Sequence, residues 1–476
     1  MRKTKKEIDK NELFASMPLG KALYIMAVPM VISQIISVVY NAVDAFFIGR
    51  TGNSMMIAAT TVTLSLVLIN IALANLFGIG GGSLVARLMG AGRPEEAKSV
   101  SAFSAYGTIC AALLYALLVG LFTDPLLRFL GASDDTVGYA TSYARFVVAC
   151  GCTPTILSMV LAHLLRNVGY SREASIGLSG GGILNVLLDP LFMFVLLPRG
   201  QEVTGAAIAT LLSNTLACVY LLFAYRKACR TAPLSFSPRQ AKSISRENRK
   251  GVFTVGVPSA ALLALYDLGS ICVNVLAAAH GDLVLAGMGI VLKIERFPNG
   301  INVGICQGMQ PIVSYNYASG DRERMEKAIA VARRAGLLVS LICVALMEIF
   351  ARPLCRVFLS TSAGDTAATL TTIAFATVFL RVRCLASPVS FMNYHSSYCL
   401  QAIGDGKSTI LHAVVREGVF YIPLMFLLDR LMGEVGLSVA FIGGEAFGAA
   451  FALLLLLRAL KKARERKLAN SPTPEN

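Results

Sequence analysis

Twelve apolar segments, each about 20 residues long, constrain this chain more than any other feature of its sequence. A segment of that length crosses the hydrocarbon core of a bilayer as an α-helix. The segments are centred near residues 33, 68, 111, 152, 185, 214, 264, 297, 346, 384, 419 and 447. With 55% hydrophobic and only 15% charged residues, the chain has too little polar surface for a soluble protein. The sequence therefore predicts an all-α membrane protein with twelve transmembrane helices.

Positive charge is concentrated in every second loop and in both tails. The most basic of these loops runs from Arg226 to Lys250 and separates the sixth segment from the seventh. Loops rich in Lys and Arg stay on the cytoplasmic side of a membrane. We therefore expect a multi-pass protein of the cell (inner or plasma) membrane with both termini in the cytoplasm. Topology accounts for the net charge of +15, so no nucleic-acid partner is expected.

Short sequence markers recur along the chain at a nearly constant spacing. The tripeptide that ends at Pro29 returns at Pro258, an offset of 229, and residues 91–97 have a counterpart near 319–328. A fainter echo pairs the five residues ending at Gly169 with those ending at Gly404. Six segments per copy give both copies the same orientation, so we expect two pseudo-symmetric six-helix lobes. The expected parts are a cytoplasmic N-terminal tail (1–20), an N-lobe (21–225), a cytoplasmic linker (226–250), a C-lobe (251–458) and a cytoplasmic C-terminal tail (459–476).

Two acidic residues lie inside the apolar segments of the first half. Asp189 follows Asn185 by four residues, so the two side chains share one face of the fifth helix. Pro190 comes directly after and is expected to loosen or kink that helix. In the first segment, a polar stripe at spacings of three and four leads to Asp44. A charge at this depth is costly unless it meets a partner or water, so both acids are predicted to be functional.

Other polar residues are spaced so that they surround these acids. They are Gln34, Tyr40 and Asn41 in the first segment, Tyr143 in the fourth and Thr210 in the sixth. An isolated Asn or Thr in a span more often forms a helix–helix hydrogen bond than a ligand contact. Two acids on separate spans favour a shared pocket, because carboxylate, amide and hydroxyl oxygens suit a proton or a sodium ion.

Charges of both signs lie in the segments of the second half. They are Asp267, Lys293, Glu295, Arg296, Arg381, Arg383, Arg416 and Glu417. We interpret them as an ion-pair network in which Lys293 or Arg296 pairs with Glu295 or Asp267, and we favour this over direct substrate contact.

Neither a metal site nor a nucleotide site is indicated by the usual motifs. The four His and eleven Cys residues form no metal-binding pattern, so no cofactor and no firm metal site are expected. The exception is a possible Na+ at Asp44, Asn185 and Asp189. The run Gly78–Gly82 follows no strand, so close helix packing explains it better than nucleotide binding.

Three stretches resemble those of a known family. They are V-Y-N-A-V-D-A-F-F-I-G (Val39–Gly49), M-G-A-G-R-P-E-E-A (Met89–Ala97) and R-N-V-G … N-V-L-L-D-P between Arg166 and Pro190. Together they resemble the multidrug and toxic compound extrusion (MATE) family, in particular its DinF-like bacterial branch, over residues 15–460. The resemblance implies two six-helix lobes around a V-shaped cleft. It also implies multidrug efflux by antiport, in which organic and often cationic compounds leave in exchange for H+ or Na+.

The resemblance also implies roles for particular residues. Cation-coupling roles fall to Asp44, Asn185 and Asp189, assisted by Asn41, Tyr143 and Thr210. Contacts in the substrate cleft are expected from Gln34, Tyr40, Asp267, Glu295 and Arg383. We expect H+ rather than Na+, because a sodium site needs about five or six oxygen ligands whereas a proton needs one buried acid. The chain is expected to be a monomer without enzymatic activity, in contact with membrane lipid and small organic substrates.

Three other functions remain open on the residues. A lipid-linked oligosaccharide flippase of the same superfamily would use an arginine-lined cavity, for which Arg145, Arg381, Arg383 and Arg416 are available. An intramembrane aspartyl protease would need Asp44 and Asp189 to share a proton, and their Asn- and Tyr-rich surroundings fit a cation better. A channel is less favoured, because the sequence contains no repeated filter.

Overall fold

The computed structural model describes residues 10–359 and 367–470, and within them the chain is helical and contains no strand. Ten helices in these ranges are long and apolar enough to cross a membrane, and a bent pair adds an eleventh. Another predicted span lies in α12 (Asp282–Ser319), whose central part is less apolar because it carries Lys293, Glu295 and Arg296. Every predicted segment centre lies in one of these helices or in the short helices that continue them. The predicted all-α membrane fold is confirmed.

The chain folds into two compact units. The first contains the described residues up to Ala260 together with Gln307–Ala328, and the second contains Ala261–Cys306 and the described residues from Ile329 onward. Helices α11 (Arg246–Ala279), α12 and α13 (Arg322–Leu359) therefore contribute residues to both units. The lobe and linker boundaries expected from the sequence stay a prediction.

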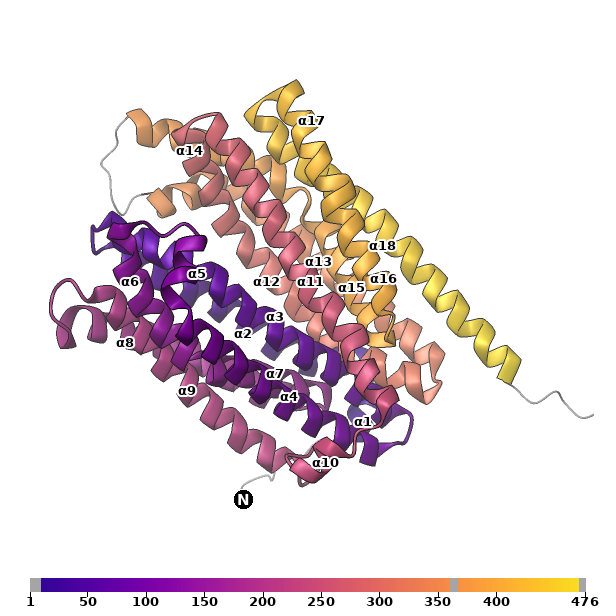
Figure 1. Cartoon of the computed structure of the whole chain (residues 1–476). Coiled ribbons are helices and arrows are strands. Elements are labelled where there is room, and N and C mark those ends of the chain that lie inside the picture. The colour runs from indigo at the N-terminus through magenta and orange to yellow at the C-terminus, as the bar shows by residue number, and fades with distance from the viewer. Residues whose placement is uncertain (1–9, 360–366, 471–476) are drawn as a thin grey trace, which may run out of the picture. The chain divides into compact units, whose positions relative to one another are not determined.

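The first unit is a bundle of long helices joined by short ones (Figure 1). Its elements are α1 (Lys10–Ala15), α2 (Leu19–Gly49), α3 (Ser54–Gly90), α4 (Pro94–Leu121), α5 (Thr123–Phe129), α6 (Asp134–Ala144), the π-helix η1 (Arg145–Cys150), α7 (Cys152–Asn167), α8 (Ser171–Leu191), the π-helix η2 (Phe192–Leu196), α9 (Glu202–Ala228) and α10 (Pro238–Lys242), with the adjoining parts of α11, α12 and α13. Helix α8 packs against α2 and α9, while α7 packs against α3 and α4.

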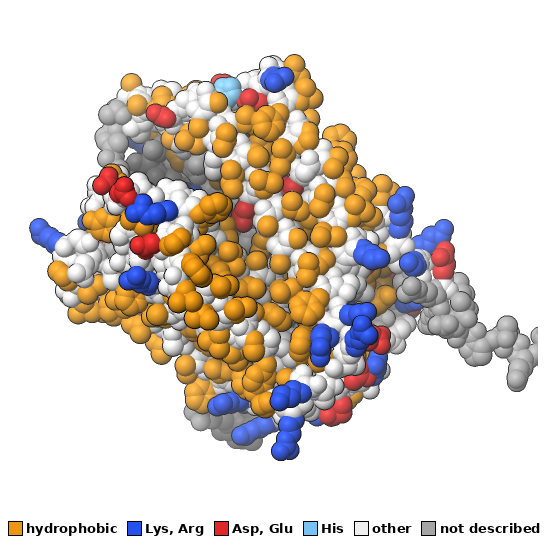
Figure 2. Space-filling model, in the orientation of Figure 1, with side chains coloured by type: hydrophobic (Ala, Val, Ile, Leu, Met, Phe, Trp, Pro, Cys, Tyr) orange, Lys and Arg blue, Asp and Glu red, His pale blue; other side chains and the backbone are white. Residues whose placement is uncertain are grey.

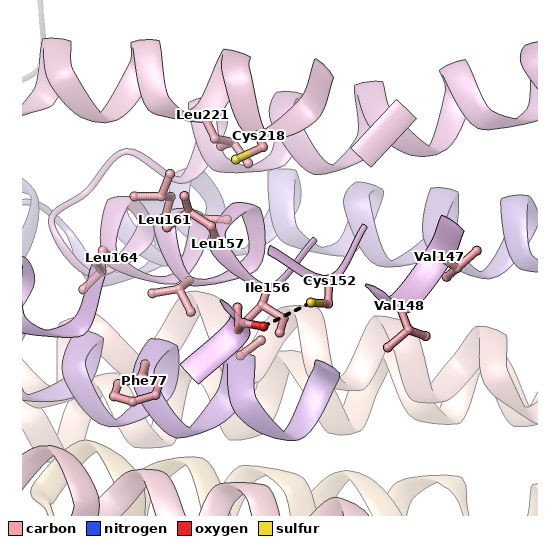
Figure 3. Packing of buried hydrophobic residues seen from close by; sticks show 14 of the residues in the cluster. Phe77, Val147, Val148, Cys152, Ile156, Leu157, Leu161, Leu164, Cys218 and Leu221 are labelled. Atoms are coloured by element: carbon pink, nitrogen blue, oxygen red, sulfur yellow. Dashed lines mark hydrogen bonds between the residues drawn. The ribbon is translucent and has the colours of Figure 1, made fainter. Parts of the chain in front are cut away.

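Apolar side chains from α3, α7 and α9 meet in the core of this unit (Figure 3). Phe77, Ile156, Leu161 and Leu221 are among the buried side chains of this cluster. Because the helices are held together by such contacts, the polar side chains of α2, α6, α8 and α9 have fixed places relative to one another.

The glycine run in α3 allows its neighbours to approach closely. A Cβ at Gly80 would lie 2.3 Å from the carbonyl oxygen of Val252, and one at Gly81 would lie 2.0 Å from Ser104 Oγ. Real Cβ atoms do not come so close, so only glycine fits at these crossings. The prediction that close helix packing explains this run is confirmed.

Two spans of the first unit are irregular. Helix α6 continues as η1, and the span then bends by 47° before α7. The bend is at Gly151, where a Cβ would lie 2.6 Å from the carbonyl oxygen of Val147. In the fifth span, α8 contains Pro190 and gives way to η2 at Phe192. The predicted disturbance at Pro190 is confirmed, since proline cannot donate a backbone hydrogen bond.

The second unit is likewise a helical bundle (Figure 1). Besides its parts of α11, α12 and α13 it contains α14 (Ala367–Cys384), α15 (Ser387–Ile403), α16 (Gly406–Val414), the π-helix η3 (Val415–Tyr421), α17 (Ile422–Met432) and α18 (Glu434–Asn470). Helices α14, α15 and α17 all pack against α18.

Large apolar side chains also cover the outside of the bundles. Leu117 of α4 and Leu341 of α13 are each 57% exposed, and Figure 2 shows hydrophobic side chains over much of the visible face. Exposed apolar surface of this extent is stable in lipid rather than in water. The chain is therefore a multi-pass membrane protein.

Candidate functional site

The centre of the candidate site is a buried carboxyl group on α8. Asp189 has no exposed surface, and Asn185, one turn earlier, is 4% exposed. Asn185 Nδ2 donates to Asp189 Oδ1 at 3.1 Å and lies 3.4 Å from Thr210 Oγ1 on α9. Within the described part of the chain, Asp189 Oδ2 has no hydrogen-bond partner. The predicted shared face of Asn185 and Asp189 is confirmed, and one carboxylate oxygen remains available for a further ligand.

A second carboxyl group approaches from α2. Asp44 is half-buried, and its Oδ1 is buried without a hydrogen-bond partner among the described residues. The carboxyl groups of Asp44 and Asp189 interact electrostatically, and both interact with the buried phenol of Tyr143 on α6. The structure therefore brings together four of the residues predicted from sequence on separate helices: Asp44, Tyr143, Asp189 and Thr210.

Among the described residues, this pair of acids lacks a basic partner. No Lys, Arg or His of the described residues forms an ion pair with Asp44 or Asp189. Two neighbouring carboxylates in a low-dielectric setting repel each other and favour binding of a cation. Carboxylate and hydroxyl oxygens are suitable ligands for a proton or a sodium ion. In the described ranges, no group of three or more His, Cys, Asp or Glu residues is arranged to hold another metal.

Three predicted residues of α2 have different surroundings. The ring of Tyr40 packs on Gly182 of α8, where a Cβ would lie 2.7 Å from Tyr40 Cδ1. Gln34 is half-buried. Asn41 is exposed, and its amide donates to the backbone carbonyl of Ser37 at 2.7 Å. Tyr40 thus lies at the contact between α2 and α8, whereas the amide of Asn41 is turned to its own helix.

In the second unit, a buried ion pair joins α12 to α14. Arg383 Nε and Nη2 donate to the two carboxylate oxygens of Glu295 at 2.8 and 2.9 Å, and the residues are 3% and 6% exposed. The guanidinium carbon of Arg383 lies 3.9 Å from the ring centroid of Phe441. Such a two-point contact fixes the orientation of both side chains.

The predicted partners in this network need a correction. We expected Lys293 or Arg296 to pair with Glu295, but the Glu295 carboxylate pairs with Arg383, and both Lys293 and Arg296 are exposed. Residues two before and one after Glu295 point to other faces of a helix with 3.6 residues per turn. Half-buried Asp267 interacts electrostatically with Arg296, but the two side chains form no ion pair among the described residues.

A second buried charge cluster in this unit includes residues that sequence reasoning missed. Arg416 Nη2 donates to Glu445 Oε1 of α18 at 2.5 Å, and Arg416 Nε lies 3.5 Å from Glu417 Oε1. Glu445 was not singled out, although an acid in the apolar twelfth segment is the same signal that identified Asp189. Asn393, which hydrogen-bonds to Glu445, and His412, which hydrogen-bonds to Asn393, carry no charge pattern that a sequence would reveal.

Comparison with known proteins decides the family. A family model described as MatE matches residues 29–191 and 258–427. The chain belongs to the MatE family. The two matched blocks begin 229 residues apart, which is the offset of the internal repeat.

Individual members agree with this assignment. Multidrug export protein MepA of Staphylococcus saprophyticus subsp. saprophyticus is 28% identical over 444 residues, which cover 93% of this chain and 94% of the relative. Among solved structures, a MATE protein in complex with MaL6 gives a TM-score of 0.89 at 23% identity, covering 97% of this chain and 100% of that one. An outward-facing multidrug resistance MATE family transporter of the MOP superfamily gives 0.88 at 23% identity and the same coverage. The MatE-family chain therefore has the MATE fold and is a multi-pass membrane transporter.

Proposed function

We propose that this MatE-family transporter exports organic, often cationic, compounds by antiport in exchange for a cation, H+ in preference to Na+. The observation that carries the proposal is the pair Asp44 and Asp189, each with one buried carboxylate oxygen that has no partner among the described residues. The likeness to Multidrug export protein MepA supports the substrate class. In this proposal the transporter works as a monomer without a cofactor, in the cell membrane, with both termini in the cytoplasm.

The coupling follows from electrostatics at the contact between α2 and α8. When a cation binds, repulsion between the carboxylates of Asp44 and Asp189 falls, and the two helices are stable in a closer packing. When the cation leaves, the repulsion returns and favours an arrangement that admits water or a cationic compound. One cation can thereby bias the transporter between two openings, as alternating access requires.

Proton is preferred over sodium because the described geometry supplies few oxygen ligands. Asn185 Nδ2 points to Asp189, so the amide presents its donor side to the acid. Asn41 turns its amide to the backbone of its own helix. A sodium site needs about five or six oxygens at short range, whereas a proton needs only one buried carboxylate oxygen without a donor, and Asp189 has one.

The residues predicted for substrate contact have unequal support. Tyr40 and Gln34 are partly accessible on α2, as is Asp267 on α11. Glu295 and Arg383 form a buried ion pair and neutralise each other. A substrate that contacted them would therefore meet a neutral pair rather than an uncompensated charge. The flippase alternative gains no support from Arg383 and Arg416, because each is paired with a buried glutamate.

The decisive experiment uses purified protein in liposomes with a pH-sensitive dye inside. Addition of a cationic dye substrate should dissipate an imposed proton gradient, and Asp189→Asn should abolish this response. Asp282→Asn is the matched control, because it makes the same chemical change at an exposed residue at the start of α12. Movement of lipid-linked sugar without any organic cation would replace the proposal with the flippase function.

A further inference from the structure

A buried cluster of three charged residues lies in the second unit, apart from the carboxylate pair. Arg416 and Glu417 are neighbours in η3, and Glu445 comes from α18. The three residues are only 5%, 4% and 3% exposed. Two acids and one base leave one negative charge in excess if all three are ionised, and a charge without compensation is costly at this depth.

Hydrogen bonding shows which acid is the better compensated. Asn393 Nδ2 donates to Glu445 Oε2 at 2.7 Å and to the Glu445 backbone carbonyl at 2.9 Å, while Arg416 donates to Oε1. Since the amide nitrogen of Asn393 faces Glu445, the amide oxygen of Asn393 faces His412 Nε2 at 3.0 Å and must accept a hydrogen bond from it. Ser397 Oγ lies 2.8 Å from the other ring nitrogen of His412. Hydrogen bonds thus run in one direction from Ser397 through His412 and Asn393 to Glu445. Both carboxylate oxygens of Glu445 accept a hydrogen bond, one from Asn393 and one from Arg416, and these bonds stabilise the ionised form.

Glu417 is in the opposite situation. In the described part of the chain its only ion-pair contact is Arg416 Nε at 3.5 Å, and no group donates a hydrogen bond to its carboxyl group. The guanidinium of Arg416 is nearer to Glu445, at 2.5 Å, than to Glu417. Its positive charge therefore stabilises the Glu445 carboxylate more than the Glu417 carboxylate. The excess negative charge of the cluster is therefore located on Glu417.

Among the described residues, no other neighbour supplies the missing positive charge. The groups that interact electrostatically with the cluster are the phenols of Tyr266 on α11, Tyr394 on α15 and Tyr421 on η3, and the imidazole of His412 on α16. Tyr421 also contacts the pair formed by Glu295 and Arg383, which is already neutral. His412 is fully buried between a hydroxyl and an amide, and no acid of the described residues contacts it, so it stays neutral.

The position of Glu417 matches the contact between α2 and α8 in the first unit. The offset of 229 that relates Pro29 to Pro258 also relates Tyr40 to Gly269, and the offset of 235 between Gly169 and Gly404 also relates Gly182 to Glu417. Where Tyr40 packs on Gly182, the second unit has Glu417 packed on Gly269, where a Cβ would lie 2.9 Å from Glu417 Oε2.

We propose that Glu417 is a proton-binding site of the second unit, whose proton neutralises the cluster and is exchanged during transport. The exchange rests on the proposed antiport, whereas binding of the proton does not. In each half, a carboxyl group with few hydrogen-bond donors then lies at the contact between the first and fifth spans of that half. Each of these fifth spans also contains a π-helix. Such π-turns frequently mark functional sites.

The binding claim is tested by infrared spectroscopy of the full-length protein in liposomes during a pH titration. A protonated carboxyl group has a C=O band distinct from that of a carboxylate, so no substrate is needed. Wild type should show a protonated-carboxyl component that Glu417→Gln lacks. Glu348→Gln is the matched control, because Glu348 is a more exposed acid of the same unit, 3.7 Å from Arg381, and this variant should retain the band.

A second variant follows from the charge count. In Glu445→Gln, Glu417 is the one remaining acid of the cluster, and the charge of Arg416 compensates it. Glu417 should then be ionised, and its protonated-carboxyl band should disappear. This variant also tests the proposal if Glu417→Gln does not fold. Identical carboxyl bands in wild type and Glu417→Gln at every pH, or a band retained in Glu445→Gln, would overturn proton binding at Glu417.

The exchange claim is tested by counting protons moved per cationic dye in the same liposomes. Glu417→Gln should move one proton fewer than Glu348→Gln. An unchanged count would overturn the exchange. Loss of the infrared band in a protein that transports no dye would refute the antiport while supporting the proton site, so the two failures are distinguishable.

Discussion

Removing Glu295 should destabilise the second unit far more than removing an exposed acid. In Glu295→Gln, the guanidinium of Arg383 stays 3% exposed but loses the counter-charge that it contacts at 2.8 and 2.9 Å. Breaking a buried ion pair from one side costs about 3–5 kcal/mol, because the other charge is left without compensation. The ring of Phe441, 3.9 Å from the guanidinium carbon, makes the same contact in both proteins and therefore does not offset this loss.

Two further variants separate the charge from the packing. Glu295→Gln with Arg383→Met removes both charges and should recover most of the loss, since apolar replacement of a whole buried pair is often neutral. Glu323→Gln removes one partner of an exposed pair with Lys327, whose side chains are 79% and 64% exposed, and should cost less than about 1 kcal/mol.

The assay follows from the composition and burial of the chain. It contains no Trp, but cysteines such as Cys306, Cys384 and Cys399 are buried and become reactive on unfolding. A thiol-reactive dye can therefore follow thermal unfolding of the detergent-purified protein. With ~2 °C per kcal/mol in large domains, Glu295→Gln should lower the unfolding temperature by about 5 °C or more. If Glu295→Gln unfolds at the wild-type temperature, or the double variant is the less stable of the two, the reasoning about the buried pair is wrong.

Three further outcomes are expected. Asp189→Asn should retain the fold and abolish gradient-driven export, because it removes a carboxylate that has no ion-pair partner among the described residues. Asp44→Asn should behave likewise. Wild-type export by a well-expressed variant would contradict the assignment. Export should follow an imposed pH gradient in sodium-free buffer, whereas export that follows only a sodium gradient at clamped pH would show that the cation is Na+. Gly81→Leu should sharply lower the yield of folded protein, because even its Cβ would lie 2.0 Å from Ser104 Oγ, whereas Gly20→Leu, with open space at the Cβ, should express as wild type.

The sequence predicted those features that depend on neighbours along one helix. The span centres, the shared face of Asn185 and Asp189 and the disturbance at Pro190 all follow from periodicity or from the missing N–H of proline. The approach of Asp44 to Asp189 was predicted because two costly charges in separate spans favour a common pocket, and in the structure the two carboxyl groups are near enough to interact electrostatically.

Features that depend on pairing between distant helices were predicted less well. Glu295 has basic residues close by in sequence, yet the helix turns them away and Arg383 of α14 reaches its carboxylate. The place of Glu445 in a charge cluster depends on its contacts with Arg416 and Asn393, which come from two other spans. Pairing across a bundle depends on helix rotation and height, and hydropathy reports neither with the accuracy that a hydrogen bond requires.

The π-helical turn η2 gives the fifth span a means of rotating locally. A π-turn holds one residue more than an α-turn, and one residue of an α-helix corresponds to about 100° of rotation. If η2 rewinds as α-helix, Val195, now 72% exposed, turns to another face while α8 keeps its hydrogen bonds. Modification of a cysteine at position 195 would then change rate when substrate is added, and an unchanged rate would argue against rewinding. A span built in this way can reorient the side chains of one segment by about 100° while that segment moves only about 1.5 Å along the helix axis.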